Sequence, residues 1–117
     1  MIDAELRDHL AATMTIDLTT HGRRSGNPTR IEIWWFHVEN RFIVTGTPGK
    51  RDWFANVITD NRVVVHTPRG DFAGTATVIE DADFRRRVFQ HPKVGWYKTQ
   101  SDLDDLVATA PMIEISF

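Results

Sequence analysis

The chain has 117 residues, of which 41% are hydrophobic and 26% charged, a size and balance that predict one globular domain over residues 1–117. The formal net charge of −2 argues against a general nucleic-acid binder, and the absence of cysteine excludes disulfide scaffolds, iron–sulfur clusters, thiolate zinc sites and thiol nucleophiles. No apolar run reaches the roughly 20 residues that cross a bilayer, and the charged N-terminus is unlike a signal peptide, so we expect a cytoplasmic protein.

The order of secondary structure follows from three patterns. Alternating or β-branched stretches predict strands, apolar residues three or four apart predict helices, and clusters of glycine, proline and asparagine predict loops. In chain order these patterns predict helix 2–10, strand 14–20, loop 21–28, strand 29–38, a tight turn at 39–40, strand 41–46, loop 47–51, helix 52–60, strand 62–67, a turn at 68–71, strand 72–79, helix 83–90, a short helix after Ser101, and strand 112–117. Asp52 and Ser101 are the expected caps of their helices.

Six strands that follow one another mainly as antiparallel neighbours predict a mainly β fold with short helices. A small closed or nearly closed barrel is expected, because closure removes exposed strand edges; an open α+β sandwich is the alternative. Strand 29–38 carries large apolar side chains on both faces. Trp34 and Phe36, on the second face, favour a homodimer seam, unless the first or last helix covers them.

Several kinds of active site are not indicated. Gly46, Gly49 and Lys50 lack the spacing of a nucleotide phosphate loop, which needs four residues between its glycines and a Ser or Thr after the lysine. The five histidines show no ligand spacing, so no metal site is predicted. No serine lies in a nucleophile elbow. If the protein is an enzyme, we expect a cofactor to carry the chemistry.

Basic residues are concentrated between His21 and Arg51, where six basic residues against two acidic ones give a local charge of +4. Glycines in loop 21–28 let backbone N–H groups converge on an anion, and residues 49–51 precede a helix N-terminus, which also favours anions. Trp53 and Asn56 are three residues apart, so both can face one pocket. The pattern predicts a site for a small anionic ligand rather than for a polymer.

Two segments, LTTHGRRSGNPTRI at 18–31 and GKRDWFANV at 49–57, resemble the deazaflavin-dependent nitroreductase and quinone reductase family. The resemblance covers residues 18–79 and implies a six-stranded split β-barrel of the FMN-binding type. It also implies coenzyme F-420, whose tail carries a phosphate and glutamates. The reduced cofactor would pass hydride to a quinone, a nitroaromatic or an activated alkene. The expected partners are therefore this cofactor and a small aromatic or quinone-like substrate.

The resemblance assigns site residues by position. Those expected around the phosphate are Arg23, Arg24, Ser25, Gly26, Pro28 and Arg30. Those expected along the ring are Thr45, Gly46 and Thr47, and those expected to close the pocket are Lys50, Arg51, Trp53 and Asn56. Tyr97, the only tyrosine, is the expected proton donor or substrate contact.

Two other functions stay open. FMN could occupy the same groove of a reductase. Alternatively, the protein could be a non-catalytic carrier or sensor of a lipid or tetrapyrrole, because the same fold accommodates several ligands. Its cavity would be lined by Trp34, Trp35, Phe36 and Phe72.

Overall fold

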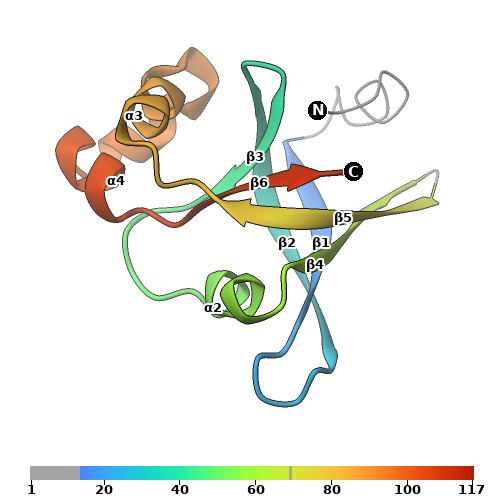
Figure 1. The fold of residues 1–117 in the computed structure, drawn as a ribbon. Helices are drawn as coiled ribbons and strands as arrows, with labels where there is room; N and C mark the ends of the chain where they lie inside the picture. The colour runs from blue at the N-terminus through green and yellow to red at the C-terminus, as the bar shows by residue number, and fades with distance from the viewer. Residues whose placement is uncertain (1–13, 69) are drawn as a thin grey trace.

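The computed structural model describes residues 14–68 and 70–117 (Figure 1). The helix expected at 2–10 lies outside these residues. The six expected strands are all present, and each of their bounds lies within two residues of the predicted one. They are β1 (Thr15–His21), β2 (Pro28–Val38), β3 (Arg41–Thr45), β4 (Arg62–Thr67), β5 (Gly70–Val78) and β6 (Met112–Ser116).

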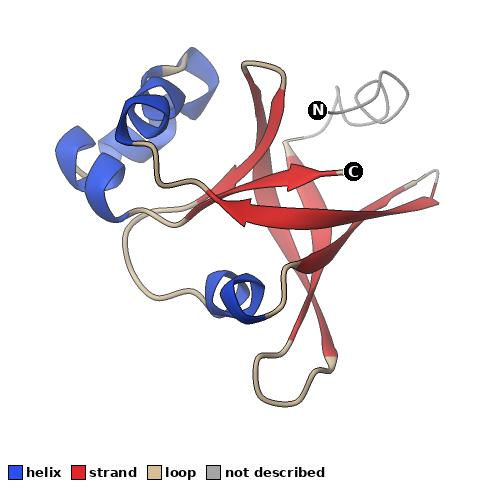
Figure 2. Ribbon diagram, in the orientation of Figure 1, coloured by secondary structure: helices blue, strands red, loops and turns tan. Residues whose placement is uncertain are grey.

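The strands form a closed antiparallel barrel in the order β1-β2-β3-β6-β5-β4, with β4 paired back to β1 (Figure 2). The barrel prediction is confirmed and the open sandwich is wrong. The closing strand is β6, which pairs with β3 on one side and β5 on the other. Each of the six described strands therefore has two partners, and none of these six is left with a free edge.

The β2–β3 hairpin turns where the sequence predicts. Glu39 and Asn40 have φ angles of 50° and 62°, the left-handed conformations that a two-residue turn between right-twisted strands requires. Val38 pairs with Arg41 across this turn, so the turn sets the register in which the rest of β2 pairs with β3.

Four helical segments complete the described chain: α2 (Asp52–Thr59), α3 (Ala82–Gln90), the 3-10 segment η1 (Pro92–Thr99) and α4 (Leu103–Thr109). Both expected caps are wrong. Arg51 and Asp102 hold the cap positions of α2 and α4, and neither makes a side-chain cap bond. The sequence did not predict η1, which begins where the His91 side chain accepts from the Lys93 N–H. None of the described helices is long and apolar enough to cross a membrane.

Alternation along β2 divides the apolar side chains between two cores. Trp35 points into the barrel and stacks on Phe42 at 4.8 Å between ring centroids. Phe36 points outward and meets Tyr97 of η1 at 5.9 Å. The four aromatic residues proposed to line a carrier cavity therefore do not line one space, because Trp34 and Phe36 lie outside the barrel.

Segment η1 covers the aromatic face that suggested a homodimer seam. Trp34 makes an edge contact with Trp96 at 5.2 Å, and Phe36 is 7% exposed. Among the described residues, the aromatic contacts to Trp34 and Phe36 come from η1, the stretch between α3 and α4. The homodimer stays a prediction, and Trp96, at 49% exposed, is the part of this face still open to a second copy.

A buried arginine ties the helices to the barrel. Arg85 of α3 is 7% exposed and has no carboxylate partner among the described residues. Its guanidinium instead donates to backbone carbonyls of Ile79 at 2.8 Å, Val107 at 2.6 Å and Leu106 at 3.4 Å, and also to that of Ala110. Burial lowers the pKa of Arg85, and the four carbonyl dipoles take the place of the water that the charge has lost.

Candidate functional site

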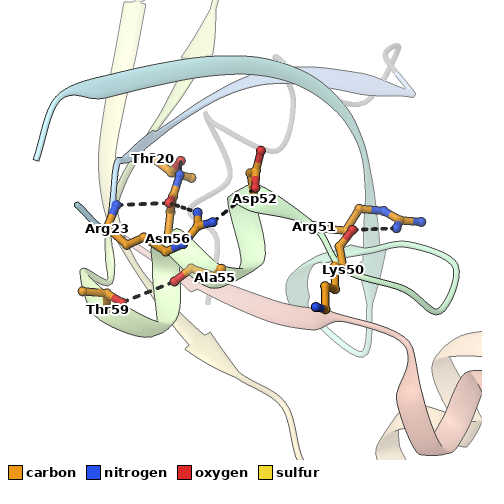
Figure 3. A network of polar contacts seen from close by, with 8 residues as sticks. All are labelled: Thr20, Arg23, Lys50, Arg51, Asp52, Ala55, Asn56 and Thr59. Carbon is orange, nitrogen blue, oxygen red and sulfur yellow. Dashed lines mark hydrogen bonds and ion pairs between the residues drawn. The ribbon is translucent and has the colours of Figure 1, made fainter. Parts of the chain in front are cut away.

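Asn56 joins helix α2 to the loop between β1 and β2 (Figure 3). Its Oδ1 accepts from the Arg23 backbone N–H at 3.2 Å and from Arg23 Nη1 at 3.0 Å. Its Nδ2 donates to Thr20 Oγ1 at 3.2 Å. Asn56 is 4% exposed and Thr20 1%, so the bond between them is shielded from water. Together with the partly buried Arg23 bonds it fixes the loop against the helix.

The loop at 22–27 is also closed by its own hydrogen bonds. The Gly22 N–H donates to the Asn27 carbonyl and the Gly26 N–H to the Gly22 carbonyl, both at 2.8 Å. Gly26 has φ +74°, a conformation that other residues adopt at a cost. The Ser25 hydroxyl accepts from the Asn27 N–H at 3.1 Å. This compact turn holds Arg23 and Arg24 at its rim.

Two cavities flank the turn. One, of about 330 Å³, is lined by Gly22, Arg23, Arg24, Ser25, Thr29, Asp52 and Asn56. The other, of about 480 Å³, is lined by Gly22, Arg23, Gly26 and residues 58–61. Arg23 Nη2 lies 3.4 Å from Asp52 Oδ1, whereas Arg24 is exposed and has no ion-pair partner within 14–68 and 70–117. The first cavity therefore has one uncompensated positive charge at its rim.

The second basic segment lies at the start of α2. Arg51 Nη2 donates to the carbonyl and hydroxyl of Thr47 at 3.2 and 2.8 Å, and Nη1 donates to the Lys50 carbonyl at 3.0 Å. Arg51 is thus occupied in closing its own loop, while the Lys50 side chain is exposed. Figure 3 shows both residues at the opposite end of the first turn of α2 from Arg23, with Asp52 between them. Both basic turns meet this helix, although neither Lys50 nor Arg51 lines the two cavities above.

Two expected phosphate residues lie elsewhere. Arg30 Nε donates to Asp17 Oδ2 at 2.9 Å and lines a different cavity, together with Glu32, His66 and Asp71. Pro28 pairs with His21 at the end of the β1–β2 ladder. Both belong to β2 rather than to the turn, so the alternation of the strand decides where they point.

Trp53 packs into the barrel core. It is 8% exposed, belongs to the interior cluster with Val57 and Val63, and meets Phe54 edge-on at 5.7 Å. Its neighbour three residues on, Asn56, faces the turn. The two side chains share one helix but contact different surroundings.

Tyr97 lies beneath the segment expected to line the ring. Its hydroxyl donates to the Thr45 carbonyl at 3.3 Å, and the Thr45 hydroxyl and the Gly46 N–H both donate to the Pro111 carbonyl, at 2.6 and 3.3 Å. Tyr97 is 4% exposed, and burial raises its pKa to about 12. A phenol held in this way positions the Thr45–Thr47 backbone and keeps its proton at neutral pH.

The single tyrosine gives a direct test of this placement. Because its folded pKa is about 12 against an ordinary 10.0, the unfolded chain loses the phenolic proton first as pH rises. The stability that the neutral phenol supplies is complete below pH 10 and is lost between pH 10 and pH 12. We expect tyrosinate absorbance of the native protein to titrate near pH 12. Tyr97→Phe should flatten the fall in unfolding free energy over that interval; an unchanged fall would show that other groups cause it.

Sequence reasoning missed Thr20 and misjudged Asp52. Thr20 holds the inward position after Ile16 and Leu18 in β1, and a polar residue at an inward position needs a buried partner, here Asn56. That break in the alternation was the available signal. Asp52 was expected to cap α2 but lies in its first turn, beside Arg23.

Comparison with known proteins gives one family and a set of related folds. The model of the family described as F420H(2)-dependent quinone reductase matches residues 2–107. No curated protein matches the sequence significantly.

Three solved structures illustrate the fold. A NimC/NimA family protein from Clostridium acetobutylicum superposes with a TM-score of 0.74 at 13% identity, covering 96% of this chain and 80% of that one. An F420-H2 dependent reductase, FDR-A, superposes with a TM-score of 0.64 at 18% identity, covering 88% of this chain and 94% of that one. The heme storage protein HutZ from Vibrio cholerae superposes with a TM-score of 0.68 at 13% identity, covering 97% of this chain and 88% of that one. The split barrel is thus shared by proteins whose ligands differ.

Proposed function

Because the chain belongs to the family of quinone reductases that use reduced coenzyme F-420, an oxidoreductase family, we propose that the turn at 22–27 and the first turn of α2 bind this cofactor. The observation that carries the proposal is the cavity in which Arg23, Arg24, Ser25 and Asn56 come together. Its basic rim and hydrogen-bonding walls suit the anionic tail of a deazaflavin.

The charges at the site fit an anion of more than one unit. Arg24 and Lys50 are exposed, with no carboxylate partner among the residues described, and Arg23 is only partly neutralised by Asp52, whose side chain is 92% exposed. A phosphate would lie against Arg24 and Ser25, and further carboxylates would extend toward Lys50. Arg30 is left out, since Asp17 already binds it.

When bound, the reduced cofactor supplies a hydride, which with one proton reduces a quinone. The residues of this chain bind, orient and exclude water. Asn56 holds the Arg23 side chain, and the closed turn holds the backbone at Arg24, before the ligand arrives, which lowers the entropy lost on binding. Tyr97 fixes the carbonyl of Thr45 at the segment proposed to face the ring. A nitroaromatic or an activated alkene is the alternative acceptor.

Reversing the charge of Arg24 tests the tail site. We expect Arg24→Glu to weaken binding of reduced and oxidised coenzyme F-420 by about tenfold, or ~1.4 kcal/mol, because it replaces an attractive charge at the rim by a repulsive one. The affinity of the wild type should fall with added salt, and that of the variant should fall less. Fluorescence titration of the cofactor measures both.

Lys98→Glu is the matched control, because Lys98 is exposed on η1 and its reversal changes the net charge equally. Equal losses in the two variants would contradict the tail site. FMN should bind more weakly than the deazaflavin, since its tail carries no glutamates. Tight FMN binding without deazaflavin binding would instead identify the flavin-dependent alternative.

A further inference from the structure

A second polar cluster lies on the outer face of the barrel, away from the turn at 22–27. His66 of β4 stands between Thr19 of β1 and Asp71 of β5. Thr19 Oγ1 is 2.7 Å from His66 Nε2, and His66 Nδ1 is 2.7 Å from Asp71 Oδ1. The three side chains thus form a continuous hydrogen-bonded chain: hydroxyl, imidazole, carboxylate.

The chemistry of the three groups sets the direction of the protons. An ionised carboxylate only accepts, so the proton of a neutral His66 ring is on Nδ1 and points at Asp71. Nε2 then carries a lone pair and accepts from the Thr19 hydroxyl. This is the arrangement in which an imidazole, oriented by a carboxylate, removes the proton of a hydroxyl nucleophile.

The strand ladders hold this arrangement rigidly. His66 pairs with Asp71 in the β4–β5 ladder and with Asp17 in the β4–β1 ladder, and Thr19 pairs with Arg30 across the β1–β2 ladder. The His66 side chain is 14% exposed, and Thr19 is also partly open. A cavity of about 360 Å³ adjoins the imidazole–carboxylate end of this chain and is lined in part by His66, Asp71, Arg30 and Pro68. Thr19 does not line the cavity, but it is partly exposed on the same face, so a small molecule can approach its hydroxyl from solvent.

We propose that Thr19, His66 and Asp71 form a nucleophilic site for acyl transfer from small activated esters, separate from the reductase site. His66 Nε2 takes the Thr19 proton as Oγ1 bonds to the ester carbonyl carbon. The bond from that carbon to the leaving alcohol then breaks, and the alcohol leaves with the proton from His66. Water, deprotonated by His66, next attacks the acyl-threonine, which releases the carboxylic acid and restores the hydroxyl.

Arg30 is the cation beside this cluster, with its charge neutralised in part by Asp17. It is the cross-strand partner of Thr19, so the two side chains are neighbours on one face of the sheet. Its guanidinium lines the same cavity, and Asp17 holds it in place through Nε at 2.9 Å. The remaining positive charge would stabilise the carbonyl oxygen of a bound ester as that oxygen becomes negative.

The test uses p-nitrophenyl acetate and the whole protein. We expect time-dependent hydrolysis above the buffer rate, with one acetyl group found on Thr19 by peptide mass spectrometry. Thr19→Ala should abolish that adduct and lower the rate at least about tenfold, and His66→Gln should lower the rate by a similar factor. Thr19→Ser keeps a hydroxyl at the same position and should restore both the adduct and the rate.

Thr77→Ala is the matched control, because Thr77 is an exposed strand threonine on β5 with no place in the cluster. Circular dichroism of each variant checks that the barrel is folded. Acetylation elsewhere with none on Thr19, or a rate in folded Thr19→Ala equal to the wild type, would overturn the proposal. Neither result bears on cofactor binding, which titration with coenzyme F-420 measures separately.

Discussion

Arg85→Met is expected to lower the free energy of unfolding by about 3–5 kcal/mol, a large part of the 5–15 kcal/mol that a domain of this size has. Methionine fills much of the same space but cannot donate. The carbonyls of Ile79, Val107 and Ala110 would then lose the guanidinium that satisfies them, whereas that of Leu106 would keep the Ala110 N–H. Each buried acceptor left without a donor costs about 1–3 kcal/mol, less what water recovers.

The position of these carbonyls explains why one residue matters so much. Three of the four belong to the end of α4 or its cap, where helix carbonyls commonly lack internal partners; that of Leu106 also accepts from the Ala110 N–H at 3.1 Å. The fourth follows β5 and precedes α3. Arg85 therefore joins the last turn of one helix, the base of another and the exit of a barrel strand. Without it, we expect α3 and α4 to loosen from the barrel before the barrel itself unfolds.

Arg86→Met provides the comparison. Arg86 is the next residue on α3, and its ion pair with Asp104 is solvent-exposed, so its loss should cost no more than about 1 kcal/mol. Urea unfolding followed by circular dichroism measures both variants. Similar midpoints for the two would mean that water replaces the Arg85 bonds at little cost, and the anchoring role would have to be abandoned.

Asn56→Ala is expected to lower the free energy of unfolding by about 2 kcal/mol and to weaken cofactor binding by more than about tenfold. The variant removes the acceptor for two Arg23 bonds and the donor to buried Thr20. The turn at 22–27 would keep its internal bonds but lose its attachment to α2. Binding would then have to order Arg23 and Arg24, which the native structure does beforehand.

Asn56→Asp separates the two consequences. The carboxylate can still accept from Arg23, but it cannot donate to Thr20 and it adds negative charge beside an anion site. We expect it to weaken binding at least as much as Asn56→Ala does, because charge repulsion replaces disorder as the cause. Gln100→Ala, at an exposed amide, should change neither stability nor affinity. Normal affinity in a folded Asn56→Asp protein would show that no anion binds near this residue.

Strand positions could be predicted because each strand carries its own burial pattern. Ile16 and Leu18 mark the inner face of β1 without reference to any other segment, and the Glu39–Asn40 turn fixes how β2 meets β3. The ends of helices, and the segments that pack over the outside of the barrel, were harder to predict from sequence. Asp52 is a residue type that commonly caps helices, yet the backbone places Arg51 at the cap position of α2. Segment η1 has no hydrophobic periodicity from which a helix could be predicted. What covers Trp34 depends on contacts between segments about 60 residues apart in the chain, and no local rule supplies them.

The residues of the candidate site also fall into those that sequence placed together and those whose position depends on the closed barrel. Arg23, Arg24, Ser25, Gly26 and Asn56 were expected together, and the structure brings them to one turn and one helix. Arg30 belongs to the same stretch of sequence but follows the alternation of β2 and binds Asp17. The Trp53 side chain packs in the hydrophobic core and not in the expected pocket. The Tyr97 hydroxyl donates to the backbone carbonyl of Thr45. Sequence identifies which residue types gather, whereas the partner of each side chain is a property of the closed barrel.

Because β6 is the strand that joins β3 to β5, the ring of strands cannot be completed until Ser116 has left the ribosome. Up to that moment β3 and β5 each present an open row of backbone donors and acceptors, the feature through which nascent chains pair with the wrong neighbour. The β1–β2–β3 meander and the β4–β5 hairpin can form early from local contacts. During synthesis the two halves of the barrel therefore stay unjoined until the five residues of β6 are available to pair with both.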